Sequence, residues 1–289
     1  MTAKLTDNPP AEVTPHQAHE RLLQMWLDGH SPHTIDSYRR YARRFLEFIN
    51  KPLHLVTLAD LQLWRASLMA ISLSSKGTAI AAIKSLLSFA HQIGVLPENV
   101  GTALKSPKVK DTLNERILNE LEVMTMISLE TDERNRVILR LLYAGGLRVS
   151  ELCALKWKDL KTRNQLGQVT VFGKGGKTRT VLLPESVWLE LCQLRGEILP
   201  QDPVFSSRQG GGHLDRTQVY RIVRAAAKRA GIEGNVSPHW LRHAHASHSL
   251  DRGAPLHLVQ ATLGHSSVAT TERYLHARPN DSSAMYLPG

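Results

Sequence analysis

Residues 239–276 read HWLRHAHASHSLDRGAPLHLVQATLGHSSVATTERYLH. Apolar residues at helical spacing cover the stretch in three parts, 239–251, 255–263 and 268–276. Histidine and arginine side chains, which bind phosphate groups, are combined here with the aromatic hydroxyl of Tyr274. A free phenol has a pKa near 10, so ionising it at pH 7 costs roughly 4 kcal/mol. A tyrosine that acts as a nucleophile needs cations and a proton acceptor nearby, and this stretch contains both.

The bulk composition favours a two-domain protein with a polyanionic partner. The chain has 289 residues and a hydrophobic content of 42%, enough for a substantial core. Its net charge is +10, and its pI is near 9.8. Neutralising phosphates releases condensed counterions, so such a charge favours nucleic acid. A basic enzyme without such a partner is the alternative.

Cysteine usage and hydropathy exclude several classes of protein. Cys153 and Cys192 are the only cysteines, and both stand in apolar helical patterns typical of buried thiols. A disulfide framework and a CxxC zinc site are excluded. The N-terminus has no apolar signal core, and no apolar run is long enough to span a membrane. We expect a soluble protein of a reducing compartment, without a membrane partner.

Composition shifts divide the chain into segments. Residues 1–13 are polar and predict a disordered arm. Residues 14–104 contain helical patterns and no strand signal, so they predict a helical domain. Residues 105–116 are basic and proline-broken, which is typical of a linker. Residues 117–289 form the second domain, with a tail at about 277–289.

A cluster of arginines lies in the first domain. Ser31-Pro32 predicts a helix start, and apolar residues at helical spacing continue to Ile49. Four arginines occupy the opposite side of this helix as two i,i+4 pairs: Arg39, Arg40, Arg43 and Arg44. Such a cluster forms either a solvated helix face or a contact with the DNA backbone, and both readings stay open here.

The second domain mixes helices with a short β-segment. Apolar helices are predicted near 135–143 and 150–157. Residues 168–172 and 178–183 are rich in β-branched residues and predict a hairpin around residues 173–177. Helical patterns return from residue 186 onward. The fold class is therefore mainly α with a small antiparallel β-sheet (α+β).

Four motifs resemble one known family. They are AGGLRVSEL at 144–152, GKGGK at 173–177, HWLRH at 239–243 and LGHSSVATTERY at 263–274. In this order they resemble the tyrosine recombinase (phage integrase) family, of the simple, Xer-like two-domain type. The first domain resembles the family's core-binding domain, less specifically. The resemblance implies a two-domain DNA clamp, in which a helical DNA-binding domain precedes an integrase-type catalytic domain.

The resemblance also implies roles for the motif residues in phosphoryl transfer. Arg148 and Arg242 would grip the non-bridging oxygens of one DNA phosphate through forked donors. Tyr274 would attack phosphorus, leaving a covalent 3′-phosphotyrosyl link and a free 5′-hydroxyl. His239 would accept the tyrosine proton or bind the phosphate, and His265 would donate to a non-bridging oxygen.

Two further residues complete the expected site. Lys174, on the hairpin, would protonate the departing 5′ oxygen, since neighbouring cations lower the pKa of a lysine. Lys177 is its rival and is otherwise expected to bind DNA. Glu151, one helical turn after Arg148, would hold that arginine in place. An ordinary solvated glutamate is the alternative.

A metal site is the rival reading of the histidine-rich helix. His239, His243, His245 and His248 cluster there, and the first two have i,i+4 spacing that suits zinc. No third ligand from elsewhere is evident, and HExxH is absent. We therefore predict no metal and no cofactor. Ala244-His245 depart from the small polar and aromatic pair that the family usually has, which affects local packing.

The resemblance implies partners as well. They are double-stranded DNA and a homo-tetramer on two DNA sites, held by the C-terminal tail through residues 284–287 docking on a neighbour. A disordered terminus is the alternative. The location would be the cytoplasm of a prokaryote, with the nucleoid. Two other functions stay open: a type IB topoisomerase that relaxes DNA, and a catalytically silent DNA-binding protein.

Overall fold

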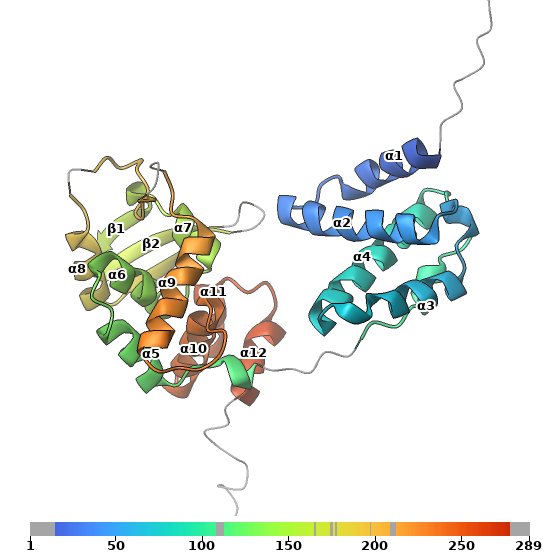
Figure 1. Cartoon of the computed structure of the whole chain (residues 1–289). Coiled ribbons are helices and arrows are strands. Elements are labelled where there is room, and N and C mark those ends of the chain that lie inside the picture. The colour runs from blue at the N-terminus through green and yellow to red at the C-terminus, as the bar shows by residue number, and fades with distance from the viewer. Residues whose placement is uncertain are drawn as a thin grey trace, which may run out of the picture. The chain divides into compact units, whose positions relative to one another are not determined.

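The computed structural model describes residues 15–107, 113–164, 166–173, 176, 178–196, 198–208 and 212–277. The chain forms two compact units, residues 1–110 and 111–289 (Figure 1). Their boundary falls within the segment 105–116 in which the sequence predicts a linker. The expected arm at 1–13, and the tail beyond residue 277, lie outside the described residues.

The first unit is helical throughout its described part. It contains α1 (Pro15–Leu27), α2 (Pro32–Ile49), α3 (Leu58–Ser67) and α4 (Leu73–Gln92). The helix α2 begins where the sequence predicts, because the Ser31 side chain accepts a hydrogen bond from the Thr34 amide and proline occupies the first turn. A capping box of Thr57 and Asp60 starts α3. Apolar faces of all four helices meet in one core.

The second unit combines helices with a three-stranded antiparallel sheet. Val169 pairs with Leu160 on one side and Val181 on the other, in the order β1-β2-β3. The prediction of a mainly α fold with a small antiparallel sheet is thus confirmed. The elements are α5 (Glu120–Ser128), α6 (Glu133–Ala144), α7 (Val149–Ala154), β1 (Leu160–Arg163), β2 (Leu166–Phe172), β3 (Thr178–Leu183), α8 (Glu185–Gln193), α9 (Arg216–Arg229), α10 (Pro238–Asp251), α11 (Leu256–Leu263) and α12 (Val268–Ala277).

The core of the second unit joins α6 to the sheet. Ile138 and Leu142 of α6 are fully buried, and they belong to the same apolar cluster as Val169 and Val181 of the sheet. The helices α10, α11 and α12 contact one another. In Figure 1 they gather at the lower end of this unit, below the sheet. The helix α11 also contacts β3, so the motifs at 239–243 and 263–274 lie close together and near the sheet.

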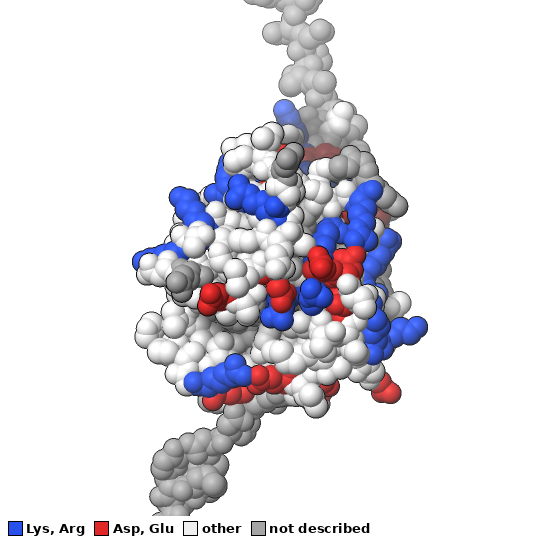
Figure 2. All heavy atoms as spheres, turned by 90° about the vertical axis from the view of Figure 1, so that its left-hand side faces the viewer, with Lys and Arg blue, Asp and Glu red and all other residues white. Residues whose placement is uncertain are grey.

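Charges are intermixed on one face of the second unit. Figure 2 shows the side of this unit that lies at the left in Figure 1, and lysine and arginine stand there beside aspartate and glutamate, with broad uncharged areas between. Within the unit, Arg140 and Glu190 form an ion pair at 3.0 Å. A surface that binds a phosphate backbone is dominated by one sign of charge. This face lacks that character.

The cysteines behave as the sequence predicts for small apolar residues. Cys153 is buried, and burial raises the pKa of its thiol to about 11. Cys192 is half-buried, and burial raises its thiol pKa too. Within the described residues, no helix combines the length and apolar character that a membrane crossing requires.

Gly167 is expected to tolerate no larger side chain. A Cβ at this position of β2 would lie 2.5 Å from Cε3 and 2.7 Å from Cδ2 of the buried Trp188 ring. Gly167→Ala should therefore lower the free energy of unfolding by about 1–3 kcal/mol, as overpacking does. Urea unfolding followed by circular dichroism measures this. Gly196→Ala, where nothing lies within 4 Å of the added carbon, is the control. Equal stability of the two variants would contradict the prediction.

Candidate active site

The helix α10 carries three polar side chains of the HWLRH motif on one face. His239, Arg242 and His243 are related by i,i+3 and i,i+4 spacing, which places them beside one another. The ring centroids of His239 and His243 lie 6.5 Å apart. Desolvation lowers the pKa of His239, and the charges of Arg242 and Arg148 lower it further. This imidazole is therefore neutral at pH 7.

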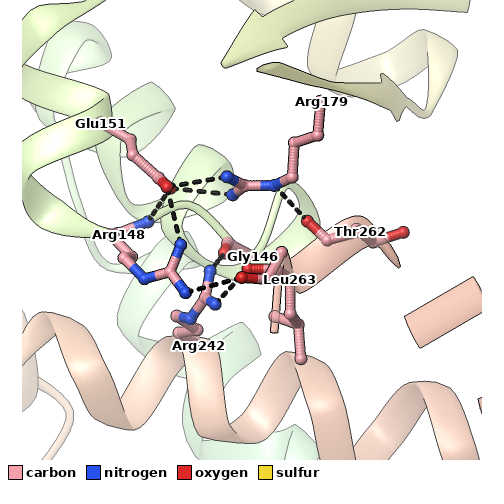
Figure 3. A network of polar contacts seen from close by, with 8 residues as sticks. Gly146, Arg148, Glu151, Arg179, Arg242, Thr262 and Leu263 are labelled. Atoms are coloured by element: carbon pink, nitrogen blue, oxygen red, sulfur yellow. Dashed lines mark hydrogen bonds and ion pairs between the residues drawn. The ribbon is translucent and has the colours of Figure 1, made fainter. Parts of the chain in front are cut away.

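Arg242 is a buried cation, only 5% exposed. Its Nη1 donates to the carbonyl oxygen of Gly146, and its Nη2 donates to that of Leu263 (Figure 3). Burial, followed by the charge of Arg148, lowers its pKa to about 9, so it remains charged at pH 7. The two carbonyls come from the turn before α7 and the end of α11. Arg242 thus ties both turns to α10.

The turn at Gly146 explains why the motif carries glycine there. Its φ is +55°, a left-handed conformation that glycine adopts without strain. A Cβ would also lie 2.9 Å from Cδ2 of His245 and 3.0 Å from Cδ2 of Leu263. His245, the departure from the family pattern, packs against this turn and donates from Nδ1 to the carbonyl of Tyr143 at 2.7 Å.

Arg148 and Glu151 lie together at the start of α7. The Arg148 amide donates to Oε2 of Glu151 at 2.8 Å, and its Nη1 donates to Oε1 at 2.9 Å. Its Nη2 donates to the carbonyl of Gly264 at 3.1 Å. That carbonyl follows the one that Arg242 binds, so the guanidinium groups of Arg148 and Arg242 are neighbours (Figure 3).

Sequence reasoning missed Arg179, which completes this network. Arg179 lies on β3, and its Nη1 and Nη2 donate to the two carboxylate oxygens of Glu151 at 2.7 and 2.8 Å. Its Nε donates to the carbonyl of Thr262 at 2.6 Å (Figure 3). A signal was present: strand alternation places Arg179 on the same face as the buried Val181 and Leu183. A charged residue on a buried face requires a partner.

Glu151 is consequently a buried carboxylate among cations. Its side chain is 5% exposed, so it is not a solvated glutamate. Burial by itself raises the pKa of this carboxyl, but the hydrogen bonds from Arg179 and Arg148 outweigh burial, and the pKa lies below its usual range. One negative charge thus partly neutralises a group of three arginines. The surplus positive charge suits an anion.

His265 follows the turn that ends α11. Gly264 caps this helix in the left-handed conformation, with φ of +63°. His265 Nδ1 lies 2.9 Å from Oγ1 of the buried Thr271, so Thr271 fixes the ring. Burial, followed by the charges of Arg242 and Arg148, lowers the pKa of His265 to about 4. A neutral ring held through Nδ1 leaves Nε2 for another partner.

Tyr274 lies on α12, and its side chain is only 6% exposed. It packs in an apolar cluster with Ala246, Val259 and Leu263. Burial raises the pKa of its phenol, and the charges of Arg242 and Arg273 offset part of that rise. The rings of Tyr274 and His265 are stacked, with centroids 6.5 Å apart and an interplanar angle of 9°.

The histidine that touches the Tyr274 hydroxyl is His243. Its Nδ1 lies 2.6 Å from Oη of Tyr274. Sequence reasoning named His239, one helical turn earlier, as the candidate proton acceptor. The sequence could not separate the two, because the choice depends on how α12 crosses α10. The structure therefore adds His243 and Thr271 to the residues around the phenol.

The chain is similar to one family of known proteins. The model of the phage integrase family matches residues 115–281, more than half of the chain. The chain belongs to this family of tyrosine recombinases. It is 34% identical to the tyrosine recombinase XerD of Vibrio cholerae over 274 residues, covering 88% of this chain and 89% of the relative. It is 36% identical to XerA of Pyrococcus furiosus over 256 residues, covering 86% and 85%.

A solved structure shares the fold. The chain matches a lambda integrase dimer bound to a core site with a TM-score of 0.75 and 20% identity, covering 92% of this chain and 97% of that one. The family match identifies the chain as a tyrosine recombinase and favours a site-specific recombinase. It lends no support to the topoisomerase or the catalytically silent binding protein.

The lysines predicted for this recombinase lie outside the described residues. Lys174 and Lys177 belong to the connection between β2 and β3. Phe172, the last residue of β2, pairs with Thr178, the first residue of β3. The hairpin that would carry Lys174 is therefore adjacent in sequence to β3, the strand that carries Arg179. The role of Lys174 stays a prediction.

Three of the four histidines of α10 make separate polar contacts, and the ring of the fourth, His239, lies 6.5 Å from that of His243. His245 binds the carbonyl of Tyr143, and Nδ1 of His248 lies 3.0 Å from the Tyr143 hydroxyl. His243 binds Tyr274. Across the part of the chain that is described, no group of three His, Cys, Asp or Glu residues is arranged to hold a metal ion.

The arginines of α2 are distinguished by their contacts. Arg43 forms a bidentate ion pair with Glu20 of α1, with both distances 3.0 Å. The guanidinium of Arg40 lies over the Tyr41 ring, 5.1 Å from its centroid. Arg40 and Arg44 are exposed, and Arg39 is half-buried. Arg43 therefore has a structural contact, whereas Arg40 and Arg44 stay the better candidates for a DNA contact.

Proposed function

We propose that this recombinase cuts and rejoins double-stranded DNA through Tyr274. The observation that carries the proposal is that the buried Tyr274 lies within reach of the charge of Arg242, while backbone carbonyls fix the guanidinium groups of Arg242 and of its neighbour Arg148. Phosphoryl transfer requires positioning and charge stabilisation above all. An arginine pair that is held before substrate arrives supplies both.

Each step of the reaction has a candidate residue. Arg148 and Arg242 hold the non-bridging oxygens, and His265 and His239 donate hydrogen bonds to the phosphate. Tyr274 Oη bonds to phosphorus as the bond to the 5′ oxygen breaks, and Lys174 protonates that oxygen. The phosphotyrosyl link retains the energy of the broken bond, so a 5′-hydroxyl can reseal the strand without ATP. The proposal requires no metal and no cofactor.

Covalent trapping tests the proposal. DNA bound in cells is recovered, and its site is built into a nicked duplex, so that the short fragment that carries the new 5′-hydroxyl diffuses away after cleavage. Incubation with the whole chain should give a protein–DNA adduct that survives denaturation. Mass spectrometry of the digested adduct should locate the nucleotide on the peptide with Tyr274. Absence of an adduct, or attachment to another residue, would overturn the proposal.

The first unit is proposed to contribute to DNA binding. Relatives of this fold have been solved as complexes with DNA, among them the lambda integrase dimer on its core site. The exposed Arg40 and Arg44 supply positive charge on α2, and Lys177 would add to it from the hairpin. In this proposal the two units hold duplex DNA between them in a clamp. The protein would act in the cytoplasm of a prokaryote, on the nucleoid.

Assembly is proposed to depend on the C-terminal tail. Four protomers would hold two DNA sites, with residues 284–287 docked on a neighbour in a head-to-tail contact that closes a ring. Deleting residues 280–289 should reduce tetramer formation on DNA while single-site binding persists. Analytical ultracentrifugation with labelled duplex measures both. Tetramers of unchanged yield would exclude the tail as the connecting element.

A further inference from the structure

The contact between His243 and Tyr274 has a chemical consequence for the nucleophile. Tyr274 Oη lies 2.6 Å from His243 Nδ1, within the range of a strong O–H···N hydrogen bond. The two rings come from different helices, α10 and α12, and their centroids are 5.7 Å apart. Tyr274 as a residue is only 6% exposed, so water has little access to its hydroxyl proton. His243 is the side chain in direct reach of it.

Charges around His243 keep its ring neutral in the free protein. Burial lowers its pKa to about 4, and neighbouring basic groups on several elements add to that effect. His239 and Arg242 come from α10 itself, Arg273 from α12, and Arg116 from the short turn Asn114–Arg116. A neutral imidazole has one ring nitrogen with a lone pair, and this nitrogen can accept a proton.

We propose that His243 is the catalytic base of this recombinase: its Nδ1 takes the hydroxyl proton of Tyr274 during strand cleavage. The inference rests on the proposed function. In the step, the Tyr274 O–H bond breaks and its proton moves to Nδ1, while Oη bonds to phosphorus. The bond from phosphorus to the 5′ oxygen breaks, and that oxygen takes a proton from Lys174. Resealing reverses each transfer, so His243 returns its proton to Tyr274.

The surroundings make this base dependent on substrate. In the free protein, the pKa of the Tyr274 phenol lies above 10 and that of His243 is about 4, so proton transfer is disfavoured by roughly 10⁶-fold or more. A DNA phosphate held by Arg148 and Arg242 brings negative charge to the cations that suppress the basicity of His243. The pKa values of His243 and of the Tyr274 phenol then move closer together. Tyr274 would thus be activated by the phosphate that it attacks.

Two rival readings predict different behaviour. If His239 takes the proton, His243 only positions the phenol, and any hydrogen-bond acceptor in its place will serve. If the hydrogen bond to His243 instead holds Tyr274 in an inactive, buried position, removal of that hydrogen bond will speed cleavage. Asn is the discriminating substitution, because its side-chain oxygen can replace Nδ1 as an acceptor but takes up no proton.

The test compares His243→Asn and His243→Ala with the whole wild-type chain. Single-turnover cleavage of the nicked duplex described above is measured between pH 6 and 10. Both variants should cleave at least about 100-fold more slowly at pH 7, a typical loss for a general base. Their rates should rise about tenfold per pH unit, because only the pre-ionised phenolate reacts, whereas the wild-type rate levels off.

His248→Asn is the matched control. It removes a histidine of the same helix from a contact with another tyrosine, since Nδ1 of His248 lies 3.0 Å from Oη of Tyr143. This variant should keep the wild-type pH profile. Thermal melting establishes whether each variant folds. If a His243 variant does not fold, His243→Gln replaces it.

The outcomes separate the two proposals. A wild-type rate and pH profile in His243→Asn, or faster cleavage in His243→Ala, would overturn the role of His243 alone. If the wild-type chain forms no adduct, the proposed function itself fails.

Discussion

Replacing Tyr274 with phenylalanine is expected to abolish the covalent protein–DNA adduct. The ring packs in an apolar cluster and is 6% exposed, so phenylalanine fills the same space. The change removes only the hydroxyl and its contact with His243. Stability should change by about 1 kcal/mol, the net value of one hydrogen bond, and binding to the recovered DNA site should persist. Denaturing electrophoresis with labelled nicked duplex measures the adduct, and a mobility-shift assay measures binding.

Tyr143→Phe is the matched control for this substitution. Tyr143 is a half-buried tyrosine on α6 whose hydroxyl contacts a histidine of α10, as that of Tyr274 does. Its loss should leave adduct formation intact. An adduct in Tyr274→Phe of wild-type yield would assign the nucleophile to another residue. Loss of the adduct in both variants would point to a general defect of folding or binding.

Local signals in the sequence predict much of the fold. The start of α2 follows from the cap at Ser31-Pro32, and the strands β2 and β3 follow from runs rich in β-branched residues. The helix α5 has a readable capping box of Asn119 and Glu122, which sequence reasoning overlooked. The strand β1 is different in kind. It has four residues, of which only Leu160 is buried, so its pairing with β2 and not its own pattern makes it a strand.

The active site is less readable, because its contacts join distant segments. Arg148 and Glu151 are neighbours in sequence, and helical spacing predicts their contact. Arg179 is 28 residues from Glu151, and the two meet only when β3 packs beside α7. The choice between His239 and His243 as the partner of Tyr274 likewise depends on the crossing of α10 and α12. Motifs therefore identify the residue types, whereas packing between elements selects the pairs.

Replacing Glu151 with glutamine is expected to destabilise the recombinase strongly. The carboxylate is the buried negative charge among Arg148, Arg179 and Arg242, and it accepts hydrogen bonds from the first two. Glutamine is nearly isosteric but neutral, so the three cations repel one another without compensation. Breaking a buried ion pair by removing one partner costs about 3–5 kcal/mol. For a unit of this size, that corresponds to a fall in Tm of roughly 10 °C.

The pH dependence of this loss follows from the pKa of Glu151. The folded-state pKa lies below the ordinary value, so the ionised carboxylate stabilises the fold at any pH above that ordinary value. The contribution disappears as pH falls through the folded-state pKa and the carboxyl is protonated. The difference in stability between the wild type and Glu151→Gln should therefore be full at pH 7 and shrink below about pH 4. Thermal melts across this range measure it.

Glu190→Gln supplies the comparison for Glu151→Gln. Glu190 lies 3.8 Å from Arg136 and 3.0 Å from Arg140, and its side chain is 24% exposed against 5% for Glu151, so its loss should cost less than the loss of Glu151. Glu151→Gln should also slow cleavage, because Arg148 loses the partner that holds its guanidinium toward the phosphate site. A saturating concentration of DNA should not restore the cleavage rate of Glu151→Gln. Equal Tm values for the two variants would show that the arginines tolerate one another without the Glu151 charge.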